Sequence, residues 1–206
     1  MILEFIFGRY CIFCQAIISD GHMCSKCKKD LPYTDREVIK IKEDDNYLSV
    51  KSVFYYEDYI MDSIYRFKYK NRKHYAKYYA RYMKSIIDNR FDVITYVPIS
   101  KKRLKERGYN QAEVLAKELG KLINIEVKEL IYRHKDTQKL RNKGVEARKN
   151  IIEGVFRKKC MVKGKKILLI DDIYTTGTTL NECSKVLNGN NVHCLTLACG
   201  KNTKKS

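Results

Sequence analysis

One stretch of sequence, residues 167–179, constrains the fold of this chain more than any other. Residues 167–170 are all apolar and run directly into Asp171 and Asp172, and a Thr-Thr-Gly-Thr-Thr turn follows two residues later. Such an unbroken apolar run predicts a strand buried on both faces, as in parallel sheets. Open α/β sheets bind ligands at the carboxyl ends of their strands, so we expect the acids and the turn to line a crevice.

The acids and the turn suit different parts of one ligand. Two adjacent carboxylates repel each other and lose hydration there, so a cation or hydrogen-bond donors must compensate them. The turn offers backbone N–H groups at a helix start, Gly177 permits close approach, and four threonine hydroxyls add donors, which suits a phosphate. Hydroxyls together with a phosphate describe a ribose 5-phosphate. The alternative, an ordinary strand–loop–helix with a threonine cap, leaves the acid pair unexplained.

The remaining hydrophobic pattern alternates between strands and helices, which predicts an α/β fold with a parallel sheet flanked by helices. We expect strands at 48–56, 92–97, 128–132, 166–170 and 192–198, and helices at 58–67, 72–87, 109–123 and 178–187. The tyrosines of residues 72–87 favour a packed helix face over nucleic-acid stacking. The polar span 133–150 predicts a long exposed loop, either a functional lid or disordered.

Four of the eight cysteines form two CxxC pairs near the N-terminus, Cys11, Cys14, Cys24 and Cys27. Four thiolates at this spacing predict one Zn²⁺, held at about 2.3 Å, that is structural because no coordination position stays open. His22 lies in the spacer and could replace one cysteine. Two disulfide bridges are the alternative, although a cytoplasmic setting disfavours them. Of the other four cysteines, Cys183, Cys194 and Cys199 sit in apolar surroundings, which predicts burial.

The charge of the chain is strongly positive, with 42 Lys and Arg against 24 Asp and Glu and a formal net charge of +18. Such charge attracts nucleic acid, acidic membrane surfaces or phosphorylated small molecules. The alternative is the Lys-, Ile-, Asn- and Tyr-rich composition that an A·T-rich genome produces. Residues 139–166 stand out, with eleven basic residues against two glutamates. With no apolar run near the ~20 residues of a membrane span and no basic start to a signal peptide, we expect a cytoplasmic protein.

Residues 167–179 resemble the phosphoribosyl pyrophosphate signature of the type I phosphoribosyltransferases. A second resemblance covers nearly the whole chain, because an ordered set of motifs is similar to the ComF family, bacterial phosphoribosyltransferase-like proteins associated with competence for DNA uptake. The set comprises the two CxxC pairs, Phe67-Lys68-Tyr69, Val97-Pro98-Ile99, Arg107-Gly108-Tyr109-Asn110-Gln111, Thr137-Gln138, Arg148-Lys149-Asn150 and the signature.

The resemblance implies a type I phosphoribosyltransferase-like fold and a role for each matching residue. Asp171 and Asp172, the implied catalytic pair, would contact the ribose 2′- and 3′-hydroxyls directly or through water on Mg²⁺. The 5-phosphate would lie on Thr175, Thr176, Gly177, Thr178 and Thr179, and the Pro98–Lys101 turn would be the pyrophosphate loop. Basic side chains then neutralise pyrophosphate, namely Lys102, Arg103 and Arg107. Residues 133–148 occupy the place of a closing hood.

The implied organisation is a zinc knuckle (1–33), a linker, strand and helices leading into the core (34–90), a phosphoribosyltransferase-like domain (91–200) and a basic tail (201–206). Three functions follow from the resemblance. The chain transfers phosphoribosyl, a pentosyl transfer of the glycosyltransferase class, to an acceptor that the sequence does not identify. Alternatively, it is a non-enzymatic competence factor associated with single-stranded DNA or competence-machinery proteins, or it is a regulator that senses phosphoribosyl pyrophosphate or a related sugar phosphate.

Overall fold

The computed structural model describes residues 9–34, 46–87, 90–135 and 152–200. Four predictions therefore fall wholly or largely outside the described residues: the charged linker segment before Asn46, the hood, the Thr137-Gln138 and Arg148-Lys149-Asn150 motifs, and the basic tail. Of the basic stretch 139–166, only residues 152–166 are described. Within the described ranges, no helix is both long and apolar enough to cross a membrane.

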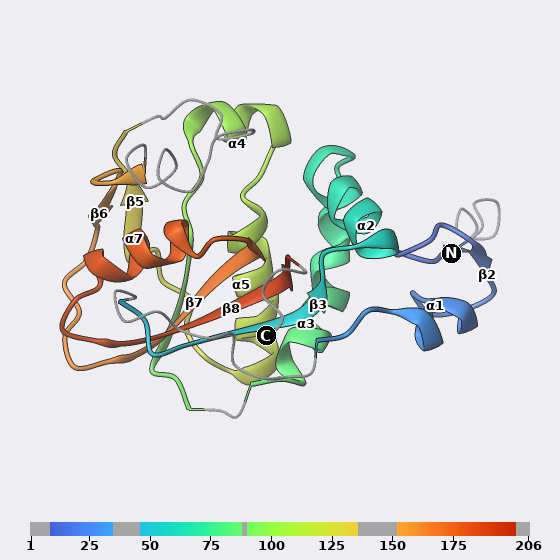
Figure 1. Cartoon of the computed structure of the whole chain (residues 1–206), viewed down its shortest axis with the longest axis horizontal. Helices are drawn as coiled ribbons and strands as arrows, with labels where there is room; N and C mark the ends of the chain where they lie inside the picture. The colour runs from blue at the N-terminus through green and yellow to red at the C-terminus, as the bar shows by residue number, and fades with distance from the viewer. Residues whose placement is uncertain (1–8, 35–45, 88–89, 136–151, 201–206) are drawn as a thin grey trace.

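A four-stranded, fully parallel sheet forms the centre of the molecule, in the order β3-β8-β7-β4 (Figure 1). Its strands are β3 (Ser49–Tyr55), β4 (Val93–Tyr96), β7 (Lys166–Tyr174) and β8 (Asn191–Cys199). β7 and β8 lie in the middle, where both faces are covered, which explains the unbroken apolar run of β7. The sheet confirms the predicted α/β class.

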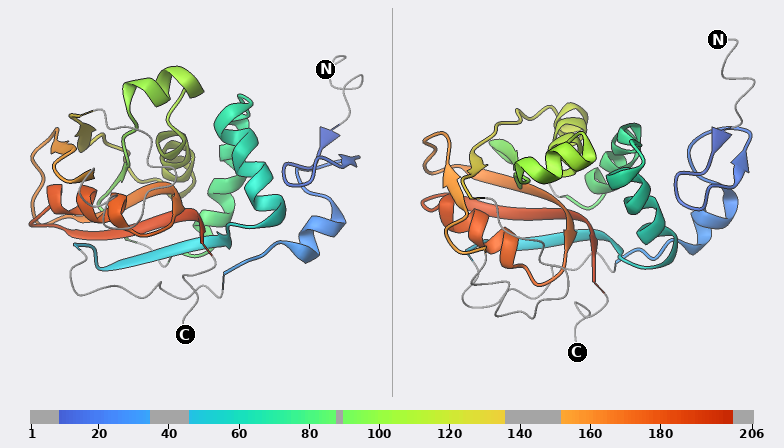
Figure 2. Two further views of the ribbon diagram at one scale, coloured as in Figure 1. Left: turned by 45° about the horizontal axis from the view of Figure 1, so that its top comes forward. Right: turned by 90° about the horizontal axis from the view of Figure 1, so that it is seen from above.

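Helices cover both faces of this sheet (Figure 2). Leu168 and Ile170 of β7 belong to one buried cluster with α3 (Ala76–Lys84) and α5 (Gln111–Ile123). Ile167 and Leu169 face the other way, into a cluster with α7 (Thr178–Val186). This alternation is the period of two expected along a strand.

The remaining elements surround the sheet, and not all were predicted. α2 (Asp58–Tyr69) and the 3-10 turn η1 (Lys73–Tyr75) precede α3, and α4 (Lys101–Arg107) precedes α5. β5 (Ile131–Arg133) pairs antiparallel with β6 (Phe156–Lys158), so the strand expected at 128–132 lies later than predicted. The sequence pattern did not predict α4 or β6. Tyr75 and Tyr79 are buried, as predicted for a packed helix face, whereas Tyr78 is half-buried.

The cysteine-rich N-terminal segment packs against the rest of the molecule through α2 and α3. It contains β1 (Arg9–Tyr10), β2 (Ile17–Ile18) and α1 (Ser25–Asp30), and α2 lies between it and the sheet (Figures 1 and 2). Phe13 is fully buried, and its ring centroid lies 5.9 Å from that of Phe54 on β3 and 6.0 Å from that of Tyr82 on α3. The segment therefore shares its core with the sheet domain.

Candidate functional site

The crevice at the acid pair opens where β4 ends and β7 continues. Tyr96, the last residue of β4, pairs with Ile170, and the Val97 N–H donates to the Ile170 carbonyl at 2.9 Å. Beyond that point β7 pairs only with β8, up to Tyr174 opposite Cys199. The strand predicted to end at residue 170 is thus longer, because β8 pairs with it through both acids. Asp171 and Asp172 lie where the sheet loses its β4 neighbour.

The crevice has a volume of about 350 Å³ and brings together most of the predicted site residues. Those that line it are Pro98, Arg103, Arg107, Asp171, Asp172, Thr175, Thr176, Thr178 and Thr179. Lys101 and Lys102 are exposed on α4 and do not line it, and their role remains a prediction. Lining residues to which the sequence assigned no role in ligand binding include Tyr65, Lys68 and Tyr69, although the last two belong to the Phe67-Lys68-Tyr69 motif.

The two acids at the crevice floor differ in their surroundings. Asp171 keeps some solvent contact through the crevice, but burial, and secondly the neighbouring Asp172 carboxylate, raise the pKa of Asp171 to about 7. Asp171 Oδ1 also accepts the backbone N–H of Asp172 at 2.8 Å. The Asp172 carboxylate pairs instead with the ammonium of Lys68 at 2.9 Å. The expected cationic compensation of the acid pair is therefore provided by a residue of α2.

The threonine-rich turn has the features of a phosphate cradle. Gly177 has φ 77°, and a Cβ there would lie 2.9 Å from the hydroxyl oxygens of both Tyr174 and Tyr47. No side chain caps α7 at Gly177, which leaves the first N–H groups of the helix available to an anion. The Thr176 and Thr178 hydroxyls lie 2.9 Å apart. The turn therefore offers a phosphate group close approach to the backbone at Gly177, threonine hydroxyls and uncapped N–H groups.

Arginines form the basic side of the crevice, on and beside α4. The Ser100 hydroxyl caps α4 by accepting the backbone N–H of Arg103 at 3.2 Å, so the helix begins at the pyrophosphate loop predicted by the resemblance. The guanidinium of Arg107 donates to Gln111 Oε1 at 2.8 Å and to the Tyr69 hydroxyl at 3.2 Å. These contacts hold a positive charge at the crevice.

The four N-terminal cysteines converge as a metal site would require. The Sγ atoms of Cys11, Cys14, Cys24 and Cys27 all lie within 4.8 Å of one another, and those of Cys14 and Cys24 are 3.5 Å apart. Thiolates around a tetrahedral zinc lie about 3.8 Å apart, so the cluster fits a Zn²⁺ without large movement.

The thiols of the cluster differ in pKa, because burial raises the pKa of Cys14 and of Cys27. The Cys27 backbone N–H donates to the Cys24 sulfur and lowers the pKa of Cys24 to about 7, which favours the thiolate form. All four cysteines are free thiols, in contrast to the disulfide alternative. His22 is not part of the cluster, since its Nε2 hydrogen-bonds with the Tyr82 hydroxyl at 2.9 Å. Cys183, Cys194 and Cys199 are buried, as predicted.

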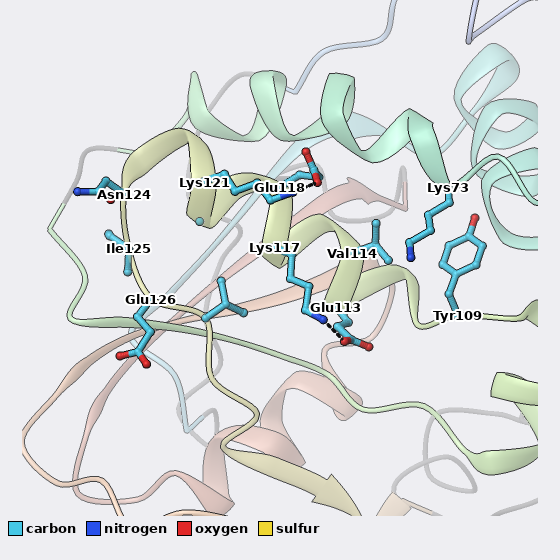
Figure 3. A pocket seen from close by; sticks show the side chains of 12 residues that line it. Lys73, Tyr109, Glu113, Val114, Lys117, Glu118, Lys121, Asn124, Ile125 and Glu126 are labelled. Atoms are coloured by element: carbon cyan, nitrogen blue, oxygen red, sulfur yellow. Dashed lines mark hydrogen bonds and ion pairs between the residues drawn. The ribbon is translucent and has the colours of Figure 1, made fainter.

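A second cavity, of about 730 Å³, lies along α5 away from the acid pair (Figure 3). Three lysines and three glutamates are among its lining residues: Lys73, Lys117, Lys121, Glu113, Glu118 and Glu126. Lys117 pairs with Glu113 at 2.6 Å and Lys121 with Glu118 at 2.7 Å. Such a balanced, internally paired surface lacks the excess positive charge that a sugar phosphate needs.

Comparison with known proteins relates the chain to one domain family. The phosphoribosyl transferase domain matches residues 70–204. Competence protein ComFC of Bacillus subtilis is 28% identical over 193 residues, covering 87% of this chain and 78% of that protein. Competence protein F of Haemophilus influenzae is 26% identical over 190 residues, covering 86% of this chain and 83% of that protein.

Solved structures with similar folds include the adenine phosphoribosyltransferase of Thermoanaerobacter pseudethanolicus. It aligns over 84% of this chain and 86% of its own, with 13% identity and a TM-score of 0.42. The chain spans only about a quarter of the length of three larger solved chains that it matches.

Proposed function

This chain belongs to the phosphoribosyl transferase domain family and, within it, to the ComF family, and from that membership we propose that it binds phosphoribosyl pyrophosphate with Mg²⁺ and transfers the phosphoribosyl group. The acceptor is not identified. The names of its relatives support a role in competence for DNA uptake.

One observation carries this proposal: the acid pair and the uncapped threonine turn line the same crevice. Carboxylates accept hydrogen bonds from sugar hydroxyls, and helix N–H groups with hydroxyls bind phosphate. A ligand that carries both sugar hydroxyls and a phosphate would satisfy both sets of groups. Arg103 and Arg107, which line the same crevice, add the charge that a second, diphosphate group needs.

Each group has a distinct part in the proposed transfer. Asp171 and Asp172 orient the ribose through its 2′- and 3′-hydroxyls, while residues 175–179 fix its 5-phosphate. The bond between the anomeric carbon and the pyrophosphate oxygen breaks, its electron pair leaves with pyrophosphate, and the acceptor bonds to the same carbon and releases a proton. Carboxylates near the ring favour the cationic sugar that forms between these events. Bound Mg²⁺ would supply further positive charge for the departing pyrophosphate.

Calorimetric titration of the full chain with phosphoribosyl pyrophosphate and Mg²⁺ tests the binding step. We expect saturable binding that is lost in the double variant D171N/D172N while its fold, followed by circular dichroism, is retained. Unchanged affinity in that variant would refute the assignment. A screen of bases and amines for released pyrophosphate then separates a transferase from a ligand-sensing regulator, which binds without turnover.

A second function, contact with single-stranded nucleic acid, is favoured by a cleft between the cysteine-rich segment and α3. The cleft has a volume of about 550 Å³, and four basic side chains line it, Arg9, Arg72, Lys77 and Arg81. The one acid in its lining, Asp20, pairs with Arg9 at 2.5 Å. The His22 and Tyr78 rings stack there with centroids 4.3 Å apart. Surfaces that bind single strands typically combine basic groups with aromatic rings on which bases can stack.

Retention of a single-stranded oligonucleotide between 50 and 200 mM salt tests this second function. K77M/R81M removes two positive charges from the cleft, and K117M/K121M removes two from α5 as the matched control. Each lost phosphate contact should reduce the slope of log affinity against log salt by about 0.7, so the cleft variant should lose roughly 1.4. Equal behaviour of the two variants would show that only net charge matters.

A further inference from the structure

The ion pair between Lys68 and Asp172 is unusual among the ion pairs of the described residues. Both side chains are only 14% exposed, whereas the other ion pairs each include at least one side chain exposed by 42% or more. Bringing a lysine ammonium this far from water is costly unless a close partner compensates it. Lys68 is therefore not an ordinary exposed lysine of a surface helix. Its partner is one of the two acids on the crevice floor.

The position of Lys68 is fixed by contacts on both sides of it along α2. The Tyr109 hydroxyl donates to the Phe67 carbonyl, and Arg107 donates to the Tyr69 hydroxyl. These contacts tie the end of α2 to Arg107, the last residue of α4, and to Tyr109 just beyond it, on the basic side of the crevice. The ammonium of Lys68 therefore reaches Asp172 from a fixed backbone.

The middle of α2 is tied to the cysteine-rich segment. The Ser63 hydroxyl donates to the Ile12 carbonyl at 2.5 Å, and Arg66 donates to the Phe13 carbonyl at 2.5 Å and to the Ile12 carbonyl at 3.2 Å. Ile12 and Phe13 are the two residues between Cys11 and Cys14. The segment that holds four thiols thus sets the position of the helix that carries Lys68.

We propose that Lys68 is a positioning residue of the phosphoribosyl site, held in place by the cysteine-rich segment through α2. Its ammonium orients the Asp172 carboxylate and adds a positive charge that favours an anionic sugar phosphate. Lys68 precedes residues 70–204, which match the phosphoribosyl transferase domain, so this chain supplies it from outside the shared domain. The proposal rests on the proposed function, because it requires phosphoribosyl pyrophosphate to bind in the crevice.

Calorimetry of the full chain with phosphoribosyl pyrophosphate, with and without added Mg²⁺, tests the proposal. K68M and K68Q remove the charge, and K68R restores it. K70M is the matched control, because Lys70 is exposed and two residues away. Without added Mg²⁺, we expect K68M and K68Q to bind roughly 30-fold more weakly than the unaltered chain, as for the loss of one member of a buried charge pair. K68R should recover part of the loss, and K70M should bind normally.

The dependence on Mg²⁺ distinguishes positioning from mere support of the fold. Added Mg²⁺ brings positive charge of its own, so it should narrow the difference between the neutral variants and the unaltered chain. If K68M does not fold, K68Q, which keeps an N–H donor for Asp172, decides the question. Neutral variants that bind like K70M in both conditions would overturn the proposal alone, whereas an unaltered chain that does not bind at all would overturn the proposed function.

Discussion

Asp171 accepts a hydrogen bond from the backbone N–H of its own neighbour, Asp172, and so the two carboxylates point to different partners although they are adjacent in sequence. Of these two carboxylates, only that of Asp172 lies within ion-pair distance of a cationic side chain among the described residues. The Asp171 carboxyl group is buried and lies beside the negatively charged Asp172, and both effects raise the pKa of Asp171 to about 7.

The first prediction concerns stability against pH in the absence of ligand. An unfolded aspartate has a pKa of about 3.9, so the folded chain binds the Asp171 proton more tightly than the unfolded chain does. The free energy of unfolding should therefore lose the contribution of Asp171 as the pH rises from about 4 to about 7. D171N removes this titration, so its stability relative to the unaltered chain should increase over that range and then level off.

Urea unfolding at several pH values measures this difference. D62N is the control, because Asp62 is exposed on α2 and its substitution should leave the pH profile unchanged. A D171N profile parallel to that of the unaltered chain would contradict the raised pKa.

The second prediction concerns the metal. We expect one zinc per chain in purified protein, because four thiolates converge at one point. C27S should lose most of the metal and unfold at a lower temperature. C160S should keep the metal content and the unfolding temperature of the unaltered chain, because Cys160 is exposed and far from the cluster in sequence. Elemental analysis together with thermal unfolding measures this, and a metal-free but fully stable protein would exclude a structural zinc.

The third prediction follows from the link through α2. Removing the metal with a chelator, followed by exchange into buffer with Mg²⁺, should weaken binding of phosphoribosyl pyrophosphate by roughly tenfold or more, as small misplacements of site residues do. R66M should reproduce part of this loss while keeping its zinc, because Arg66 holds the Ile12 and Phe13 carbonyls but no cysteine sulfur. Metal-free protein that binds as tightly as before would show that the two sites are independent.

The fourth prediction compares two glycines with similar backbone angles. Gly177 has φ 77° and Gly164 has φ 68°, so alanine at either position should cost about 1–2 kcal/mol of backbone strain. Only at Gly177 would the new Cβ also clash, with the Tyr174 and Tyr47 hydroxyls, whereas nothing lies within 4 Å at Gly164.

G177A should therefore be less stable than G164A in urea unfolding, and it alone should lose affinity for phosphoribosyl pyrophosphate. Equal stability of the two variants would mean that the turn can relax around a methyl group.

The main sheet was predictable from the sequence because its strands are rich in apolar, β-branched and aromatic residues. The end of β7 was not, since the polar residues Asp171 and Asp172 remain in the strand through pairing with β8, which the local pattern does not reveal. α4 was missed for a related reason: none of its residues is buried, so it carries no apolar stripe. The signal that could have found it is Ser100 before the helix and Gly108 after it, a typical pair of caps.

The site was predictable in its acids, threonines and arginines, which are close in sequence to the strand ends that position them. Lys68 was not, because its partner lies 104 residues further along the chain. Its only signal was the Phe67-Lys68-Tyr69 triplet, of which Lys68 and Tyr69 line the crevice and Phe67 is buried. The role of a residue in such a short motif can be inferred only when the fold shows which distant residues its side chain contacts.

β3 lies before the residues that match the phosphoribosyl transferase domain, and yet β8 pairs with it along six residue positions. Trimming the gene to the matched region would strip the outer strand from the sheet and leave the backbone of β8 bare along one side. Exposed strand backbone promotes self-association, so the shortened product should precipitate or form oligomers instead of serving as a minimal enzyme.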